Sequence, residues 1–369
     1  MGIGGGRARV RPAGLLSGYA GALADRYPRS VVLAWSSSIR GCCGVVALVA
    51  ALQQWPVPVL VGAVAVAAVA ATPAYPAVAA AAPQCVPAAA LPAANTLVSG
   101  VENAGWTVGP GLLGVVMLAG GDPSAAIAVS TLLLAAGTVA ACGVALPAPR
   151  PGPRGRRDLL VAARLVLHAP VLRGPLALAT IGNFLYGYLV VALVLLGTAP
   201  GAAPDAVGRL NTALAVGAVA SLLVVHRLAG RPRPVPVLRA AMVAFGVCVL
   251  LLGLVRSPIP MVLLVGAAGA GTLIAEIVAV TLVQRAAAPA MHARIFGIYD
   301  QLAGVAIALG SLVAGPLAGR LGPAAGTVLT AAAALVLVGW RGGGWPAAGS
   351  PAEPAAENCP GYVHQPWTT

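Results

Sequence analysis

Charged residues are scarce in this chain of 369 residues: they make up 8% of it, against roughly 25% in an average soluble protein. Lysine is absent, so all 22 basic residues are arginine, and they face nine acidic residues. Because 59% of the residues are hydrophobic, too little polar surface remains to cover a soluble fold. A disordered chain is excluded as well, since it needs low hydrophobicity and high charge.

Patterns that bind metals or carry out catalysis are also missing. The six cysteines form no CxxC pair and have no metal-ligand spacing with the four histidines, so we interpret them as small apolar side chains. The phosphate-binding loop of ATP-driven pumps, GxxxxGK followed by serine or threonine, does not occur, and neither does HExxH. We therefore expect no metal, no cofactor and no enzymatic activity.

Long apolar runs dominate the rest of the sequence. A helix needs about 20 apolar residues to cross a bilayer core of ~30 Å, and ten runs of about this length are separated by short turn-like segments. We predict an all-α polytopic membrane protein with ten complete spans and part of an eleventh at 12–24. The predicted complete spans are 31–52, 56–79, 100–119, 124–146, 171–197, 206–229, 235–255, 258–284, 297–319 and 322–340.

The arginines lie unevenly on the two sides of these spans. The connections on one side hold fifteen of them, whereas those on the other side hold only Arg209, Arg256 and Arg320. Cytoplasmic loops carry the excess of basic residues, so the side with fifteen arginines is predicted to be cytoplasmic. Because the positive charge is spread over loops rather than gathered in one patch, we expect no nucleic acid partner.

The chain divides in the middle at a basic segment rich in proline and glycine. We predict an N-terminal helical bundle at 1–146, a cytoplasmic linker at 147–170, a C-terminal six-helix bundle at 171–340 and a disordered tail at 341–369. A weak internal repeat supports two halves, because Leu23-Ala24-Asp25-Arg26 aligns with 228–231 and Gly109-Pro110 with 315–316 at nearly the same offset. Parallel repeats of six helices are a known transporter architecture.

The residues from Gly21 to Leu33, and those from Gly105 to Gly114, resemble signature motifs of one transporter family, the major facilitator superfamily. The residues from Gly21 to Leu33, with Asp25, Arg26 and Arg29, resemble its G-x-L-A-D-R-x-G-R-R-x-x-L loop between the second and third helices, although Pro28 and Ser30 depart from that pattern. The residues Gly105, Gly109, Pro110 and Gly114 resemble the fifth-helix pattern G-x-x-x-G-P-x-x-x-G of proton-coupled drug exporters. Likeness to the macrolide and siderophore exporter branch extends to Thr72-Pro73, to Asn95 and to Gln284-Arg285.

This resemblance implies a fold of two helical bundles that transports by alternating access. The family has twelve helices, and against that pattern the chain lacks the first helix and most of the second. Two alternatives follow: a start site assigned too far downstream, or a truncated transporter-like protein that does not transport. In-frame apolar codons upstream of Met1 would favour the first, and a stop codon there the second.

The resemblance also implies a conformational latch in the first loop, formed by Gly21, Asp25, Arg26 and Arg29. A carboxylate is stabilised at a helix N-terminus by the free N–H groups and the helix dipole. Asp25 would hold the start of the span 297–319, while the two arginines would bind acidic residues or lipid phosphate. The alternative is that these residues are solvated loop charges that only set the topology.

The small residues of the second motif predict a tight contact on one helix. Gly105, Gly109, Pro110 and Gly114 are spaced by about one turn, and Pro110 removes a backbone hydrogen bond and permits a bend. We expect them to seal one side of the interface between the two halves. Ordinary close packing of membrane helices is the alternative.

Three ionisable residues fall inside predicted spans: Arg40, Glu102 and Glu276. Such residues are costly in a membrane and usually pair with one another or line a cavity. Glu276 is the better candidate for a proton carrier, because a structural pair between Arg40 and Glu102 would explain the other two. Asn183 and Tyr186 lie in the first span of the second half and would line the substrate cavity, with simple packing as the alternative.

Together these features favour a secondary active transporter that exports small amphipathic molecules in exchange for protons. We expect a multi-pass monomer in the plasma membrane, whose partners are a small-molecule substrate, protons and the lipid bilayer. The alternative from another class is the transporter-like membrane protein without transport activity.

Overall fold

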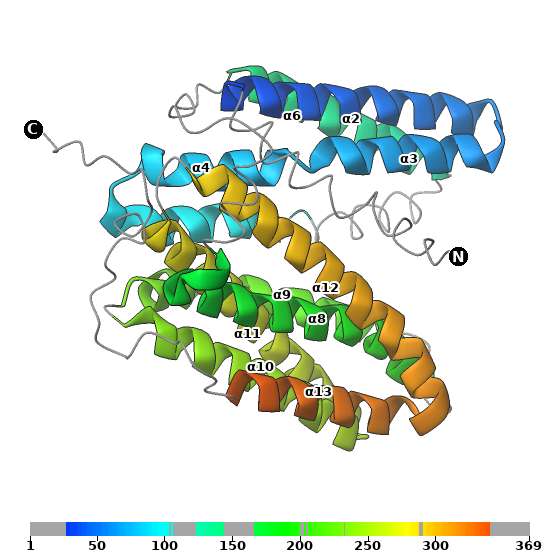
Figure 1. The fold of residues 1–369 in the computed structure, drawn as a ribbon. Helices are drawn as coiled ribbons and strands as arrows, with labels where there is room; N and C mark the ends of the chain where they lie inside the picture. Colours follow the sequence, from blue (N-terminus) through cyan, green and yellow to red (C-terminus); the bar gives the residue numbers. More distant parts are fainter. Residues whose placement is uncertain are drawn as a thin grey trace, which may run out of the picture. The chain divides into compact units, whose positions relative to one another are not determined.

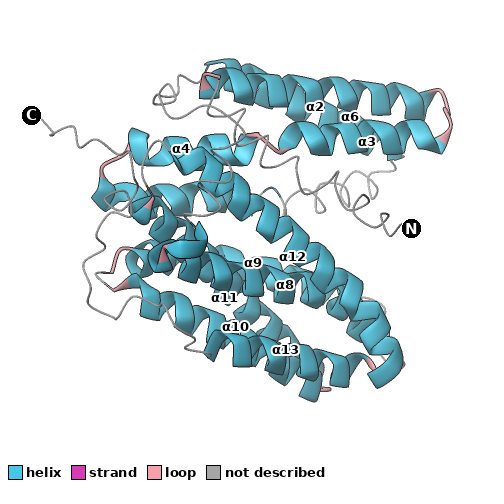
Figure 2. Cartoon of the chain, in the orientation of Figure 1, coloured by secondary structure: helices cyan, strands magenta, loops and turns pink. Residues whose placement is uncertain are grey.

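The computed structural model describes residues 27–102, 105, 123–143, 166–199, 203, 206–231, 233–287 and 291–339. Within these residues every regular element is a helix (Figure 1, Figure 2). In chain order they are α2 (Arg29–Leu52), α3 (Val57–Ala71), α4 (Ala74–Cys85), η1 (Ala88–Ala90), α6 (Pro123–Gly143), α8 (Pro170–Gly197), α9 (Ala206–Ala229), α10 (Pro234–Leu254), α11 (Pro258–Ala286), α12 (His292–Leu321) and α13 (Pro323–Gly339). Residues 91–102 are helical too.

The lengths of these helices match the predicted spans. Seven described helical segments are long and apolar enough to cross a membrane when α3 and α4 are taken together. Part of α6 and the whole of α13 are apolar but shorter. The all-α membrane class is thereby confirmed, and nine of the ten predicted spans fall on described helices. The tenth, 100–119, lies mostly outside the described residues, as do the partial span 12–24, most of the linker 147–170 and the tail 341–369.

By its contacts the chain forms two compact units. The first comprises Met1–Ala81, Val116–Ala163 and Pro289–Gln301, and the second comprises Ala82–Val115, Arg164–Ala288 and Leu302–Thr369. Each unit therefore contains segments from both sides of the linker. The predicted division into bundles at 1–146 and 171–340 stays a prediction.

Prolines fix where many of the helices begin. The helices α6, α8, α10, α11 and α13 each start at a proline. Proline suits the first helical position, because its missing N–H would have no partner there and its φ angle is already helical. This explains why the observed starts lie within a residue or two of the starts predicted from hydropathy.

One predicted span, 56–79, is interrupted. The helix breaks at Thr72 and Pro73, and α4 then continues to Cys85. Pro73 cannot donate to a carbonyl one turn earlier, and its ring clashes with the preceding turn. Close to the break, the hydroxyl of Ser36 on α2 donates to the carbonyl oxygen of Ala70 at 2.7 Å. A carbonyl in the last turn of α3 thus gains a partner from the neighbouring helix.

The core of the second unit lies between α8, α9, α10, α11 and α13. Its buried side chains form one cluster: Leu185, Leu189, Leu193, Leu196, Leu210, Leu214, Phe245, Val249, Leu252, Val265, Ala268, Ala331 and Ala334. Helices α9 and α11 approach most closely at two glycines, because a Cβ on Gly217 would overlap the carbonyl oxygen of Gly266, and one on Gly269 that of Leu214. Small residues at such crossings let membrane helices pack backbone to backbone.

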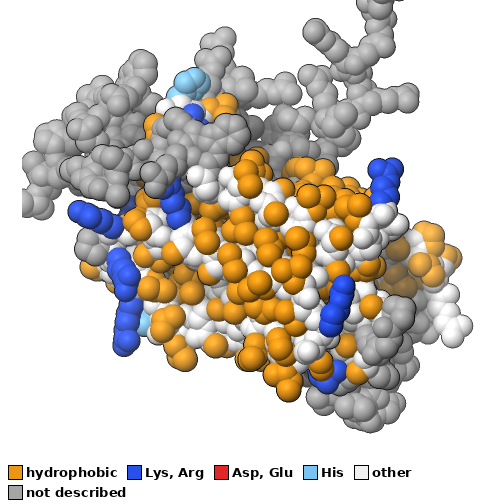
Figure 3. Space-filling view, turned by 90° about the horizontal axis from the view of Figure 1, so that it is seen from below, with side chains coloured by type: hydrophobic (Ala, Val, Ile, Leu, Met, Phe, Trp, Pro, Cys, Tyr) orange, Lys and Arg blue, Asp and Glu red, His pale blue; other side chains and the backbone are white. Residues whose placement is uncertain are grey.

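Outside the core the surface is apolar. Large side chains such as Leu223, Leu312 and Val139 are 76%, 70% and 75% exposed. Figure 3 shows one face covered mostly by hydrophobic side chains, with basic side chains toward its margins. Apolar helix faces of this kind match lipid tails rather than water.

Candidate functional site

Three of the predicted mid-membrane residues come together in the second unit. Glu276 lies on α11 and is half-buried, Tyr186 lies on α8 and is half-buried, and Glu102 is exposed at the end of the helical residues 91–102. Glu102 and Tyr186 each lie within the range of electrostatic interaction with Glu276, although no hydrogen bond joins the three. These side chains come from three helical segments that are remote in sequence, and together they are the polar group around Glu276.

Asn183 lies one turn before Tyr186 on the same face of α8. It is half-buried, and its side-chain amide donates to the carbonyl oxygen of Ala179 at 2.9 Å. One amide hydrogen is therefore used within its own helix. The other polar atoms of this side chain provide a donor and an acceptor beside Tyr186.

Arg40 belongs to the other unit, where it is half-buried on α2. Glu102 belongs to the second unit, with Glu276. The alternative of a structural pair between Arg40 and Glu102 stays a prediction, as does the cavity-lining role of Arg40.

Most residues of the two family motifs lie outside the described part of the chain. These are Gly21, Asp25 and Arg26 in the first motif, and Gly109, Pro110 and Gly114 in the second. Arg29 is described: it is the first residue of α2 and is only 2% exposed. Gly105 is exposed, and apart from its own stretch of chain no described atom lies within 4 Å of the position that its Cβ would take. The latch and the packing role of these motifs therefore stay predictions.

A buried polar contact joins residues 91–102 to α11. The side-chain amide of Asn95 donates to the Thr281 hydroxyl at 2.9 Å and to the side-chain oxygen of Gln284 at 2.5 Å. The Thr281 hydroxyl in turn donates to the carbonyl oxygen of Ile277 at 2.7 Å. Sequence analysis singled out Asn95 and Gln284 only as parts of a resemblance and missed that they meet. The available signal was an amide side chain inside an otherwise apolar helix, which needs a partner.

An aromatic contact joins α4 to the start of α12 in the first unit. The ring of Tyr75 stacks on Tyr299, with centroids 6.3 Å apart, and meets the edge of Phe296 at 6.4 Å. His292 lies edge-on to Phe296 at 6.5 Å. Aromatic pairs in these geometries stabilise a contact beyond the area that they bury.

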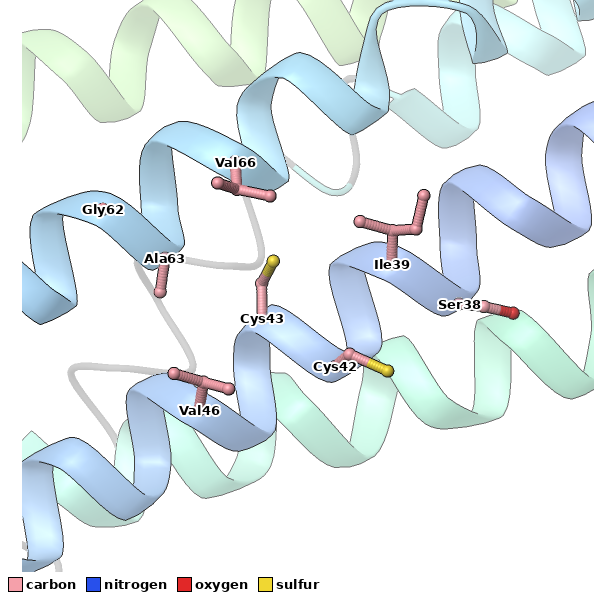
Figure 4. Close-up of a pocket in the computed structure, with 8 residues that line it drawn as sticks. All are labelled: Ser38, Ile39, Cys42, Cys43, Val46, Gly62, Ala63 and Val66. Atoms are coloured by element: carbon pink, nitrogen blue, oxygen red, sulfur yellow. The ribbon is translucent and has the colours of Figure 1, made fainter.

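A groove of about 380 Å³ runs between α2 and α3 in the first unit (Figure 4). Its walls are almost wholly apolar: Ser38, Ile39, Cys42, Cys43, Val46, Gly62, Ala63 and Val66. Cys43, Ile39 and Val66 lie close to one another in the close-up. The groove contains no carboxylate and none of the predicted site residues, so the polar group around Glu276 is the stronger candidate for a functional site.

Comparison with known proteins gives one family match. The model of the Major Facilitator Superfamily matches residues 12–311. A search of curated proteins found no match.

Several solved structures share the fold. The human organic anion transporter MFSD10 (TETRAN) is similar with a TM-score of 0.70 at 18% identity, over 88% of this chain and 80% of that one. A bacterial homologue of the iron transporter ferroportin, in an outward-facing state, gives 0.67 at 15% identity over 88% and 86%. The E. coli fucose:proton symporter FucP (N162A) gives 0.65 at 13% identity over 88% and 86%. At such low identity these likenesses show the fold alone.

Proposed function

Because the chain belongs to the major facilitator superfamily, a family of membrane transporters, we propose that it is a proton-coupled exporter of small amphipathic molecules. It works as a multi-pass monomer in the plasma membrane. Its two halves rock about a site near the middle of the membrane, which opens to one side at a time.

The observation that carries this proposal is the polar group formed by Glu276, Tyr186 and Glu102. A carboxyl group among apolar helices can bind and release a proton as its surroundings change between dry and wet states. Glu276 is the proton carrier in the proposal, and Tyr186 and Asn183 contact the substrate. Proton coupling is named for two structural neighbours, the fucose:proton symporter and a proton:xylose symporter, although their substrates differ from those proposed here.

The two family motifs have separate roles in the proposed cycle. Gly105, Gly109, Pro110 and Gly114 let their helix approach and bend at the interface between the halves, which keeps one side sealed. Asp25, with Gly21, Arg26 and Arg29, stabilises the conformation that is closed to the cytoplasm. This role follows from the attraction between a carboxylate and a helix N-terminus.

The full chain in proteoliposomes tests the proposal directly. An inside-acid pH gradient is imposed, and uptake is followed for ethidium, a permanent cation, and for anilinonaphthalene sulfonate, a permanent anion. Neither probe redistributes by titration of its own groups, so accumulation reports exchange for protons by the protein. We expect gradient-dependent accumulation of at least one of them. Equal signals from protein-containing and empty liposomes for both probes would contradict proton-coupled export.

A change in the first motif gives a second test. Asp25→Asn keeps the shape of the side chain but removes the charge that the latch uses. We therefore expect gradient-driven uptake to fall by roughly tenfold, since a coupling between two sites typically changes affinity by about 5- to 150-fold. Membrane insertion, measured as the amount of monodisperse protein, should not change. Asp122→Asn, in the connection before α6, is the matched control and should transport normally. Full activity of Asp25→Asn would rule out the latch.

A further inference from the structure

The contact between Asn95, Thr281 and Gln284 is buried and uncharged. The three side chains are 4%, 1% and 4% exposed. Their hydrogen bonds run in series from the Asn95 amide to the Thr281 hydroxyl and on to the backbone of α11, while Gln284 accepts a second bond from the same amide. Buried amides in apolar surroundings are costly unless they are paired, so this contact strongly favours one arrangement of the two helices.

The contact lies at the cytoplasmic ends of both helices. Gln284 is followed by Arg285, in a connection that the distribution of arginines assigns to the cytoplasm. Residues 91–102 also reach the end of α9, because the Pro92 ring lies near Gly230, at the start of another arginine-rich connection. Asn95 precedes the linker in sequence, whereas Thr281 and Gln284 follow it. This contact therefore joins the two halves of the chain.

The first unit contains a contact of the same kind. Tyr75 precedes the linker, and its partners Phe296 and Tyr299 follow it, near the start of α12 and its own arginine-bearing connection. Each unit thus holds a side-chain contact between the halves near a cytoplasmic helix end. The one in the second unit depends on directional hydrogen bonds, which are lost once the helices separate by a few ångströms.

From these contacts we infer that Asn95 is an uncharged latch that holds the cytoplasmic side closed. The inference rests on the proposed function, because a latch between the halves matters only if they move. Opening toward the cytoplasm separates Asn95 from Thr281 and Gln284 and replaces their bonds with bonds to water. Since none of the three side chains titrates or carries charge near neutral pH, the hydrogen bonds among them do not weaken as the pH or the salt concentration changes. A latch through Asp25 would weaken as salt screens its charge.

Thiol labelling measures this opening without requiring transport. In a full chain whose six cysteines are replaced by alanine, Ser99→Cys places a reporter one turn beyond Asn95, at a position that is 8% exposed. A membrane-impermeant maleimide is added to inside-out vesicles, so that it reaches the cytoplasmic face. We expect Asn95→Ala to raise the labelling rate about tenfold, which corresponds to about 1.4 kcal/mol in the opening equilibrium. Gln284→Ala should also raise the labelling rate. The rate in the double variant should be only slightly higher than the faster of the two single-variant rates, because both changes remove the same hydrogen bond.

Three controls separate a latch from a general loss of structure. Asn211→Ala removes an exposed amide that, among the described residues, donates within its own helix to the Val207 carbonyl oxygen, and it should leave the rate unchanged. A second reporter, Ala334→Cys, lies in the core of the second unit and should stay unlabelled in every variant. Raising the salt concentration should not change the effect of Asn95→Ala.

The outcomes that overturn the latch are specific. One is labelling of Ser99→Cys at the parent rate in folded Asn95→Ala. Another is a parallel rise at Ala334→Cys, which would mean that Asn95 only stabilises the fold. If the protein accumulates neither ethidium nor anilinonaphthalene sulfonate but Asn95→Ala still raises the labelling rate, the latch stands and the proposed export function fails, so the two failures can be told apart.

Discussion

Replacing Glu276 with glutamine is expected to abolish uptake against a gradient while leaving the protein folded. Glutamine keeps the size and most hydrogen bonds of the side chain but cannot bind and release a proton. Movement of substrate down its own gradient should continue, because it needs no proton exchange. In proteoliposomes we expect ethidium accumulation under an inside-acid gradient to fall by at least about tenfold, equivalent to about 1.4 kcal/mol of lost driving force.

The response to pH gives the sharper comparison. Uptake by the parent protein should change with the imposed gradient, whereas uptake by Glu276→Gln should be the same with and without it. Glu353→Gln, in the C-terminal segment beyond the predicted spans, is the matched control and should behave as the parent. If Glu276→Gln still accumulates the probe in response to the gradient, the proton is carried elsewhere.

Enlarging Gly217 is expected to have the greatest effect on folding. Its Cα lies against the backbone of Gly266, so an added Cβ would overlap the Gly266 carbonyl oxygen and force α9 and α11 apart. Backbone cannot move aside as a side chain can. We expect Gly217→Ala to lower the free energy of unfolding by about 1–3 kcal/mol, and Gly217→Leu to prevent recovery of monodisperse protein.

Another glycine on the same helix provides the control. Gly208 is exposed, and apart from the backbone of its own helix and its chain neighbours no described atom lies within 4 Å of its would-be Cβ. Alanine is preferred to glycine in a helix by about 1 kcal/mol, so Gly208→Ala should leave stability unchanged or raise it. Thermal unfolding in detergent, followed by size-exclusion chromatography, distinguishes the two variants. Equal melting temperatures for Gly217→Ala and Gly208→Ala would show that the close approach of α9 and α11 is unimportant for stability.

The helices themselves were predictable because their signal is local. Apolar runs of sufficient length locate the spans, and prolines such as Pro170, Pro234 and Pro258 mark their first residues. The break at Pro73 was missed because hydropathy does not register a lost backbone hydrogen bond. Pro73 and Pro76 were nevertheless visible in the run and could have predicted it.

The grouping of the site residues could not be predicted in the same way. Glu276 stood out alone, as a charge in an apolar run, but its proximity to Tyr186 and Glu102 depends on how three helices pack. The same holds for Asn95 and Gln284, which are 189 residues apart in the chain. Gly217 meets Gly266 only at one rotation of α11 about its own axis. Because α11 is mostly apolar all round, its sequence does not show which face packs against α9.

The bond from Ser36 to the carbonyl of Ala70 has a consequence for the biogenesis of the protein. Only residues 53–56 separate α2 from α3, so the two helices can pair as a hairpin as soon as the second has been synthesised. A backbone carbonyl near the break would then enter the bilayer with its partner already in place, as hydrocarbon surroundings demand. We therefore expect α2 and α3 to leave the translocon together rather than one after the other.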